Sequence, residues 1–171
     1  MHAMIVGTTI EIRDATPADL HDALALNEAA VPHVNSVPFE QMQDFSEHAA
    51  YFRVALANGS MAAFLVGLTP DADYGSPNFR WFCEHFRQFA YIDRIAVAEH
   101  ARRLGLASAL YDDFESRFAG RVPVLACEVN LRPANLASMQ FHLRRGFAQV
   151  GSQQIDNGGK EVAMLIKELD H

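Results

Sequence analysis

The spacing of apolar positions changes from a strand-like to a helix-like period near the middle of the chain, and this change marks its central segment. Residues 91–97 (YIDRIAV) are rich in β-branched and aromatic side chains, as is typical of a strand. After a short polar turn, apolar residues recur at every fourth position over 106–118, which predicts a helix. Residues 121–129 (RVPVLACEV) then predict a second strand. This order predicts a right-handed crossover between two parallel strands.

The remaining elements follow from alternation, helix-start signals and turn residues. Thr16 and Pro17 predict the start of a helix, with Thr16 as its N-cap. Asn58-Gly59 and the turn at 156–159 are hairpin signals. Further strands are predicted at 8–13, 51–57, 61–69, 147–154 and 160–169, and further helices at 39–48, 78–86 and 133–145. The order predicts an α/β (α+β) fold with a mixed central sheet flanked by helices.

Length and composition indicate one globular domain spanning residues 1–171. Half of the 171 residues are apolar, and a chain of this size buries a substantial core. The formal net charge of −7 argues against a nucleic-acid surface and mildly favours a neutral or cationic substrate. An anionic ligand would need a local basic site.

Cysteine usage and hydropathy bear on the compartment. Cys83 and Cys127 lack any motif spacing, which favours reduced thiols. No apolar run approaches membrane-spanning length, and residues 1–7 lack the charged region and long apolar core of a signal peptide. We therefore expect a soluble cytoplasmic protein with no nucleic-acid or membrane partner. The sequence is compatible with either a monomer or a homodimer.

The junction between the central strand and helix has the character of an anion site. Gly105 and Ala107 place almost no side chain where the helix begins, so its unpaired backbone N–H groups are accessible to a ligand. Arg102 and Arg103 add two guanidinium groups suited to phosphate. The alternative is an ordinary helix start with a solvated basic turn.

Several familiar kinds of chemistry have no motif in the chain. The eight histidines show no HxH or HxxxH pair, and no Cys/His cluster is present, so we expect no metal site. The GxSxG elbow, the P-loop lysine motif and the dinucleotide GxGxxG are absent. A phosphate site beside a strand is what remains.

The element order and two motifs resemble the GNAT superfamily of acetyl-CoA-dependent N-acetyltransferases. The family's cofactor signature, (Gln/Arg)-x-x-Gly-x-(Gly/Ala), is matched by residues 102–107 (RRLGLA), five residues beyond Val97. A second match covers residues 135–142 (NLASMQFH) and ends in Gly146-Phe147. The resemblance is tight over residues 91–147 and rests on element order elsewhere. It implies a GNAT-like fold.

The resemblance also implies how acetyl-CoA binds. The backbone N–H groups of residues 104–109 would hold the pyrophosphate, and the backbone of Ile95 and Val97 would pair with the pantetheine arm like an added strand. Asn135 would contact the same arm, and it could equally serve as an N-cap. The full set of cofactor residues implied in this way is Ile95, Ala96, Val97, Arg102, Arg103, Leu104, Gly105, Leu106, Ala107, Ser108, Asn135, Ser138 and Phe141.

Three residues are catalytic candidates within this resemblance. Many family members carry a Tyr as general acid for the leaving thiolate at the position of His142, so His142 is either a substitute acid or a spacer. Asp93 and Glu128 are alternative general bases, with a narrow preference for Asp93. Asp93 could instead form a salt bridge with Arg94 or Arg103, and Glu128 could be an exposed strand end.

The acceptor site has no diagnostic motif. In this fold, substrate residues come from the first helical loop and the variable strand connections, here His33, Asn35, Tyr74, Trp81 and Phe82. Trp81 and Phe82 could instead anchor their segment on the core. We expect transfer of an acetyl group from acetyl-CoA to a primary amine of a small molecule or peptide. The alternative is a non-catalytic acyl-CoA-binding regulatory module.

Overall fold

The structure is a computed structural model that describes residues 2–5 and 7–170. Met1 and Val6, which belong to the segment expected not to be a signal peptide, lie outside the described residues, as does His171. The chain divides into two compact units. The first unit contains the residues up to Leu68 together with Asp93–Arg117, and the second contains Thr69–Ile92 together with the residues from Phe118 onward.

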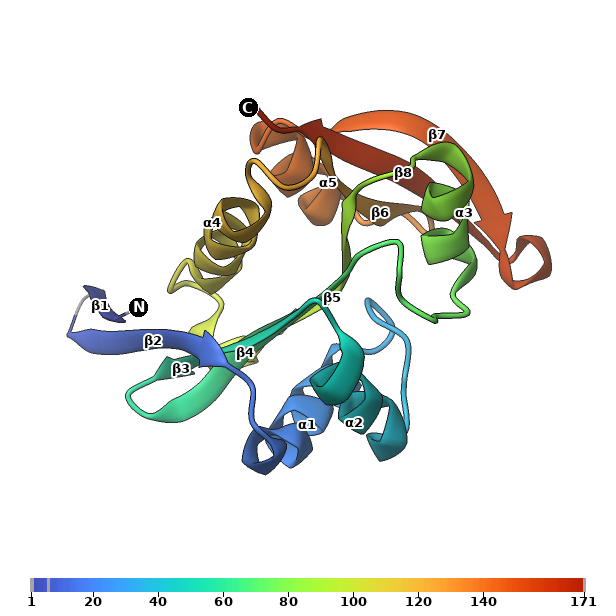
Figure 1. The fold of residues 1–171 in the computed structure, drawn as a ribbon. Coiled ribbons are helices and arrows are strands. Elements are labelled where there is room, and N and C mark those ends of the chain that lie inside the picture. Colours follow the sequence, from blue (N-terminus) through green and yellow to red (C-terminus); the bar gives the residue numbers. More distant parts are fainter. Residues whose placement is uncertain (1, 6, 171) are drawn as a thin grey trace. The chain divides into compact units, whose positions relative to one another are not determined.

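The first unit is built on an antiparallel sheet with helices on both faces (Figure 1). Its strands are β1 (His2–Ile5), β2 (Thr8–Asp14), β3 (Tyr51–Ala57) and β4 (Ser60–Leu68), which pair in sequence order. Helices α1 (Leu20–Ala30) and α2 (Phe39–His48) lie on one face, and α4 (Leu106–Phe118) lies on the other. The second part of β5 (Ala90–Val97) completes this unit.

A close contact between a glycine and a phenylalanine packs α4 onto β4. A Cβ atom added at Gly67 would lie 2.2 Å from Cε2 of Phe114, so only glycine fits there. The Phe114 ring also meets the Tyr51 ring edge-on, with centroids 5.0 Å apart. Both aromatic side chains are almost fully buried, and this packing fixes α4 on the sheet.

The second unit combines a mixed sheet with two helices. Strand β6 (Val124–Arg132) pairs with β8 (Lys160–Glu168), and β8 pairs with β7 (Ala148–Ile155), both antiparallel. The first part of β5 runs parallel to β6, with Ala90 opposite Leu125 and Tyr91 opposite Ala126. Helices α3 (Pro77–His85) and α5 (Leu136–Arg144) complete the unit.

The predicted fold class is confirmed, and most predicted elements lie within a few residues of their observed bounds. The helix start at Thr16 is a short 3-10 turn (Pro17–Asp19) that leads into α1. Asn58 and Gly59 both have positive φ, as the predicted hairpin turn requires. The strand predicted at 121–129 is displaced to Val124–Arg132, and β1 was not predicted.

Candidate active site

The turn before α4 has the geometry of an open anion site. A 3-10 turn (Glu99–Ala101) follows β5, and α4 begins at Leu106. Gly105 has φ +71, and no heavy atom lies within 4 Å of a Cβ built on it, so the space above the turn is open. The carbonyl of Gly105 accepts from the N–H of Ala109 at 3.0 Å. The preceding N–H groups of the first turn therefore have no acceptor within the helix.

The side chains around this turn suit a phosphate group. Arg102 and Arg103 are exposed, so both guanidinium groups face solvent. Leu106 is buried and holds the helix start on the core. Ala107 and Ser108 are small, so their side chains leave room for a ligand beside the first turn. Free N–H groups, a helix dipole and two cations together fit the pyrophosphate of coenzyme A.

The strand that precedes the turn alternates in exposure. Ala96 and Ala98 are buried, and Ile95 and Val97 are half-buried. The N–H of Ala98 donates to the carbonyl of Ala62 on β4 at 2.7 Å, which fixes the end of the strand.

Asp93, the narrowly preferred base, lies in a buried ion pair. Its Oδ2 accepts from Nε of Arg94 at 2.7 Å, and the two side chains are only 4% and 2% exposed. The structure thus contains the salt bridge that the sequence left as the alternative. The Asp93 carboxylate is thus engaged by a guanidinium and shielded from solvent.

Glu128, the other candidate base, is held by a neighbouring strand. The hydroxyl of Tyr91 donates to its Oε2 at 2.7 Å. Tyr91 is fully buried on β5, and Glu128 is half-buried on β6. The hydrogen bond orients the Glu128 carboxylate from a rigid, buried donor.

His142 lies on α5, and one of its ring nitrogens is hydrogen-bonded to the helix backbone. Its Nδ1 is 2.7 Å from the carbonyl oxygen of Ser138, one turn earlier. Burial lowers the pKa of His142, and the nearby Arg145 lowers it further, although the bond to Ser138 opposes these effects. A carbonyl oxygen only accepts, so Nδ1 carries the proton, and Nε2 is the unprotonated nitrogen of the neutral ring.

Asn135 caps the start of α5, which is the N-cap role that the sequence offered for it. Oδ1 of Asn135 accepts from the N–H of Ser138 at 3.2 Å. Phe141 is half-buried, and the guanidinium of Arg145 lies 5.7 Å from the centre of its ring. The cap uses only the oxygen of the Asn135 side chain, so its amide N–H groups remain compatible with a ligand contact.

The residues expected at the acceptor site have different surroundings. His33 is exposed, and Asn35 accepts hydrogen bonds from Arg94. Tyr74 is half-buried and meets Phe79 edge-on.

The two aromatic residues expected on α3 pack within the second unit. Phe82 is fully buried, with its ring 6.0 Å from that of Phe89 and 5.7 Å from that of Tyr91. Trp81 stacks on His85 and covers Gly151 of β7, where an added Cβ would come within 2.5 Å of the indole. These contacts are those of the anchoring alternative.

Sequence reasoning missed two residues of this region. The sequence predicts Tyr91 only as a strand residue and Arg94 only as a salt-bridge partner for Asp93. The available signal was their position, since a charged group or a tyrosine hydroxyl inside an apolar strand needs a buried partner. Among the described residues, no group of three His, Cys, Asp or Glu side chains could hold a metal ion, and no helix is long and apolar enough to cross a membrane.

Solved structures with the same fold are known. The ribosomal-protein-S18-alanine N-acetyltransferase from Escherichia coli is 18% identical, with 95% of each chain covered and a TM-score of 0.73. Ard1 from Thermoplasma volcanium is 20% identical over 95% of this chain and 99% of its own, with a TM-score of 0.75. Arabidopsis thaliana NAA60 in complex with acetyl-CoA is 14% identical over 94% of this chain and 99% of its own, with a TM-score of 0.74. These identities establish the fold alone.

Family membership comes from a separate comparison. No curated protein matches the chain. The model of the acetyltransferase (GNAT) family matches residues 19–147, which include both candidate bases, the Gly105 turn and His142. The predicted cofactor, acetyl-CoA, is confirmed by this match, because GNAT acetyltransferases use it as acetyl donor. The chain belongs to the GNAT family of acetyltransferases.

Proposed function

We propose that this acetyltransferase transfers the acetyl group of acetyl-CoA to a primary amine of a small molecule or peptide, by direct attack within a ternary complex. The observation that carries the proposal is the open, doubly cationic turn at Gly105 in a chain of this family. The cofactor supplies an acetyl group activated as a thioester. The protein must bind it, bring an amine to it, and remove a proton from that amine.

Binding of acetyl-CoA is assigned to two backbone segments of the first unit. The N–H groups of residues 105–108 would hold the pyrophosphate, with Arg102 and Arg103 adding charge, whereas those of Leu104 and Ala109 already donate to the carbonyls of Ala101 and Gly105. The half-buried Ile95 and Val97 would offer their backbone to the pantetheine arm.

We assign the general base to Glu128 in preference to Asp93. An amine is protonated at neutral pH, so a carboxylate has to accept a proton, either directly or through water. Asp93 is buried in its ion pair with Arg94, whereas Glu128 is half-buried and is oriented by the Tyr91 hydroxyl. The Glu128 carboxylate also provides a negative charge for a cationic acceptor.

His142 is a poor source of a proton for the departing thiolate. Donation from Nε2 would require the doubly protonated ring, and the lowered pKa of His142 disfavours that form at neutral pH. A thiolate whose conjugate thiol has a pKa near about 8.5 leaves without much help. We therefore propose that His142 chiefly packs α5, and that water protonates the thiolate.

The acceptor class is an amine of a peptide or a small molecule. The E. coli neighbour acts on a protein alanine, and Arabidopsis thaliana NAA60 has been solved with a bisubstrate analogue. The net charge of −7 is consistent with a cationic acceptor. The free thiols Cys83 and Cys127 are consistent with a cytoplasmic location.

Release of coenzyme A from acetyl-CoA tests the proposal. The acceptor panel comprises a hexapeptide with a free N-terminal alanine, a blocked peptide containing one lysine, and spermidine. We expect acetyl-CoA binding by calorimetry and amine-dependent coenzyme A release with at least one acceptor. Binding without release for every amine would instead support a non-catalytic acyl-CoA-binding module.

A further inference from the structure

Arg94 is a buried cation whose fork of donors reaches three separate segments of the first unit. Besides its ion pair with Asp93, Arg94 donates from Nη1 to Oδ1 of Asn27 on α1 at 2.9 Å. Nη1 also donates to the carbonyl oxygen of Asn35 at 3.3 Å, and Nη2 donates to Oδ1 of the same residue at 2.8 Å. The guanidinium lies 5.3 Å from the centre of the Phe45 ring on α2.

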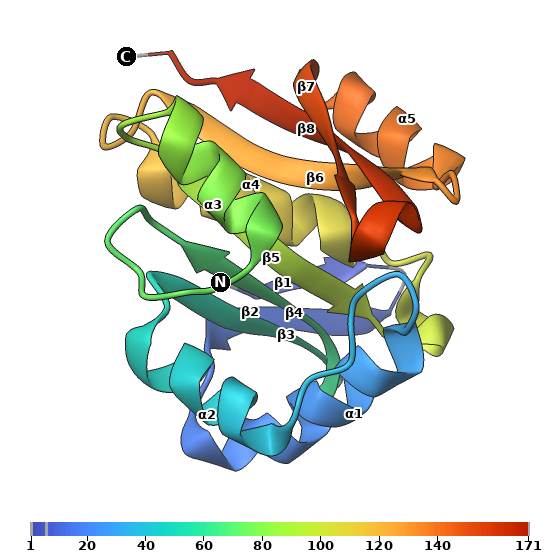
Figure 2. The ribbon, with the colours of Figure 1, turned by 90° about the vertical axis from the view of Figure 1, so that its right-hand side faces the viewer.

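These contacts converge on the loop of residues 31–38, which connects α1 to α2 (Figure 2). Asn35 receives hydrogen bonds on both its backbone and its side-chain oxygen, and Asn27 adds a third, from Nδ2 to the Asn35 carbonyl at 3.1 Å. Asn27 is fully buried, so its amide must find such partners. The loop is thus fixed at Asn35 by two buried side chains.

The next two residues of the loop are held as well. The hydroxyl of Ser36 donates to Oε1 of Glu28, and the backbone N–H of Val37 also bonds to Glu28. These bonds lower the pKa of Glu28, because they stabilise its carboxylate. The loop is therefore held by hydrogen bonds at residues 35–37, although Asn35 and Ser36 are exposed, as is His33.

We propose that Arg94 is a positioning residue that fixes the acceptor-binding loop, and that Asn35 acts through Arg94 and not by touching the amine. The inference rests on the proposed function and on the sequence-based expectation that this loop, which contains His33 and Asn35, binds the acceptor. A guanidinium is suited to the task because its planar fork serves several acceptors at once. Loosening the loop should weaken acceptor binding and leave the pyrophosphate turn unaffected.

Hydrogen exchange on the free protein tests the anchoring without any substrate. Arg94→Lys keeps a positive charge beside Asp93 but removes the fork, and Asn35→Ala removes one end of it. Each change should raise amide exchange over residues 33–37 by about tenfold, and the double variant should exchange no faster than the faster single variant. Unchanged exchange in both single variants would overturn the anchoring.

Steady-state kinetics with the best amine of the panel test the functional part. Each variant should raise the KM for the amine by about tenfold, with the KM for acetyl-CoA and kcat within about twofold of wild type. Asn35→Asp retains an acceptor oxygen for Arg94 and should restore the KM. Effects of Arg94→Lys and Asn35→Ala that multiply in the double variant would instead indicate direct contact of Asn35 with the amine.

A matched control separates positioning from general loss of stability. Arg53 of β3 is also partly buried and pairs with Asp113 and Asp14, neither of which belongs to the 31–38 loop. Arg53→Lys should lower stability without changing exchange over residues 33–37 or the KM for the amine. If Arg53→Lys raised the KM for the amine as much as Arg94→Lys does, the positioning role would be overturned. If no amine of the panel is acetylated, the proposed function fails, whereas the exchange result still decides the anchoring.

Discussion

The hydroxyl of Tyr91 lies 2.7 Å from Oε2 of Glu128 and donates a hydrogen bond to it, across the parallel pair of strands β5 and β6. Tyr91 is fully buried, so the donor has little freedom to move. A carboxylate held in one orientation is a better proton acceptor for a bound amine than a mobile one, because the geometry of proton transfer is set in advance.

The first prediction separates the two candidate bases. Glu128→Gln keeps the shape of the side chain but removes the proton acceptor, so kcat should fall by about 10²-fold or more. Asp93→Asn should act mainly through Arg94 and raise the KM for the amine. The measurement is a pH–rate profile of each variant with the best panel amine, and the acidic limb should be lost only in Glu128→Gln.

Tyr91→Phe gives an internal check on the same assignment. It removes the hydrogen bond to Glu128 and retains the buried ring, so we expect a fall in kcat of about threefold to tenfold with unchanged acetyl-CoA affinity. A loss of the acidic limb in Asp93→Asn, with a normal profile in Glu128→Gln, would return the base to Asp93.

How far the sequence determines this structure differs between local and long-range features. The hairpin at Asn58-Gly59 and the Gly105 turn were predictable because each depends on neighbouring residues. Strand β6 runs past its predicted end to Arg132, where it pairs with Glu161 of β8, so a distant partner sets its length.

The same distinction holds for the candidate site. Arg94 meets Asn27 across 67 positions of sequence, and Tyr91 meets Glu128 across 37. No local pattern encodes such pairs. The sequence shows only that polar residues interrupt an apolar strand, and the identity of their partners follows from the packing of α1 and the pairing of β6.

The second prediction concerns the pyrophosphate turn. Gly105→Glu should weaken acetyl-CoA binding by about 10²-fold, because a carboxylate would face the phosphate oxygens at the helix start. The positive φ adds a backbone strain of about 1 kcal/mol to the folded state. Isothermal calorimetry with acetyl-CoA measures the affinity.

Gly120 offers a matched control for that strain. It has φ +78 and open space around it, as Gly105 does, but it follows the C-terminal end of α4. Gly120→Glu should cost similar stability and leave the affinity for acetyl-CoA within about twofold. Equal affinities of Gly105→Glu and Gly120→Glu would remove the basis for the pyrophosphate site.

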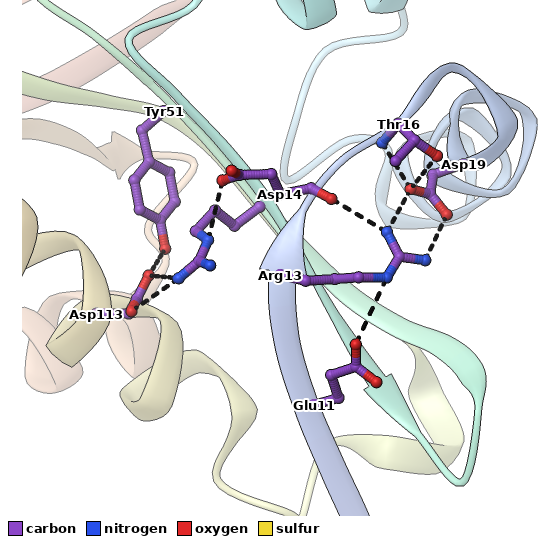
Figure 3. Close-up of polar contacts among 8 residues, drawn as sticks. Glu11, Arg13, Asp14, Thr16, Asp19, Tyr51 and Asp113 are labelled. Carbon is purple, nitrogen blue, oxygen red and sulfur yellow. Dashed lines mark hydrogen bonds and ion pairs between the residues drawn. The ribbon is translucent and has the colours of Figure 1, made fainter. Parts of the chain in front are cut away.

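The third prediction concerns a polar cluster between β3 and α4 (Figure 3). Asp113 accepts hydrogen bonds from Tyr51 at 2.7 Å and from Arg53 at 2.9 Å. These bonds lower the pKa of Asp113 despite the opposing effect of its partial burial. Asp113→Ala leaves the buried Tyr51 hydroxyl without this acceptor and leaves Arg53 paired with Asp14, so unfolding free energy should fall by about 2–3 kcal/mol.

Asp14 is the control for this cluster, because it pairs with the same arginine from an exposed position. Its Oδ1 lies 3.1 Å from Nε of Arg53, and its side chain is 75% exposed. Asp14→Ala should change stability by less than about 0.5 kcal/mol in urea unfolding. Similar losses for the two variants would show that the Tyr51 and Arg53 bonds to Asp113 contribute little.

The last prediction uses the lowered pKa of His142, which couples folding to pH. The unfolded chain binds a proton at His142 near its ordinary pKa of about 6.5, and the folded protein does so only at lower pH. Between these two values the unfolded state binds more protons, so stability rises with pH in this window and is lost as pH falls below about 6.5. His142→Phe should flatten this slope in urea unfolding measured at a series of pH values.

The same variant should keep at least about one third of the wild-type kcat, because water can protonate the thiolate. A loss of 10²-fold or more, restored in part by His142→Tyr, would establish His142 as the general acid.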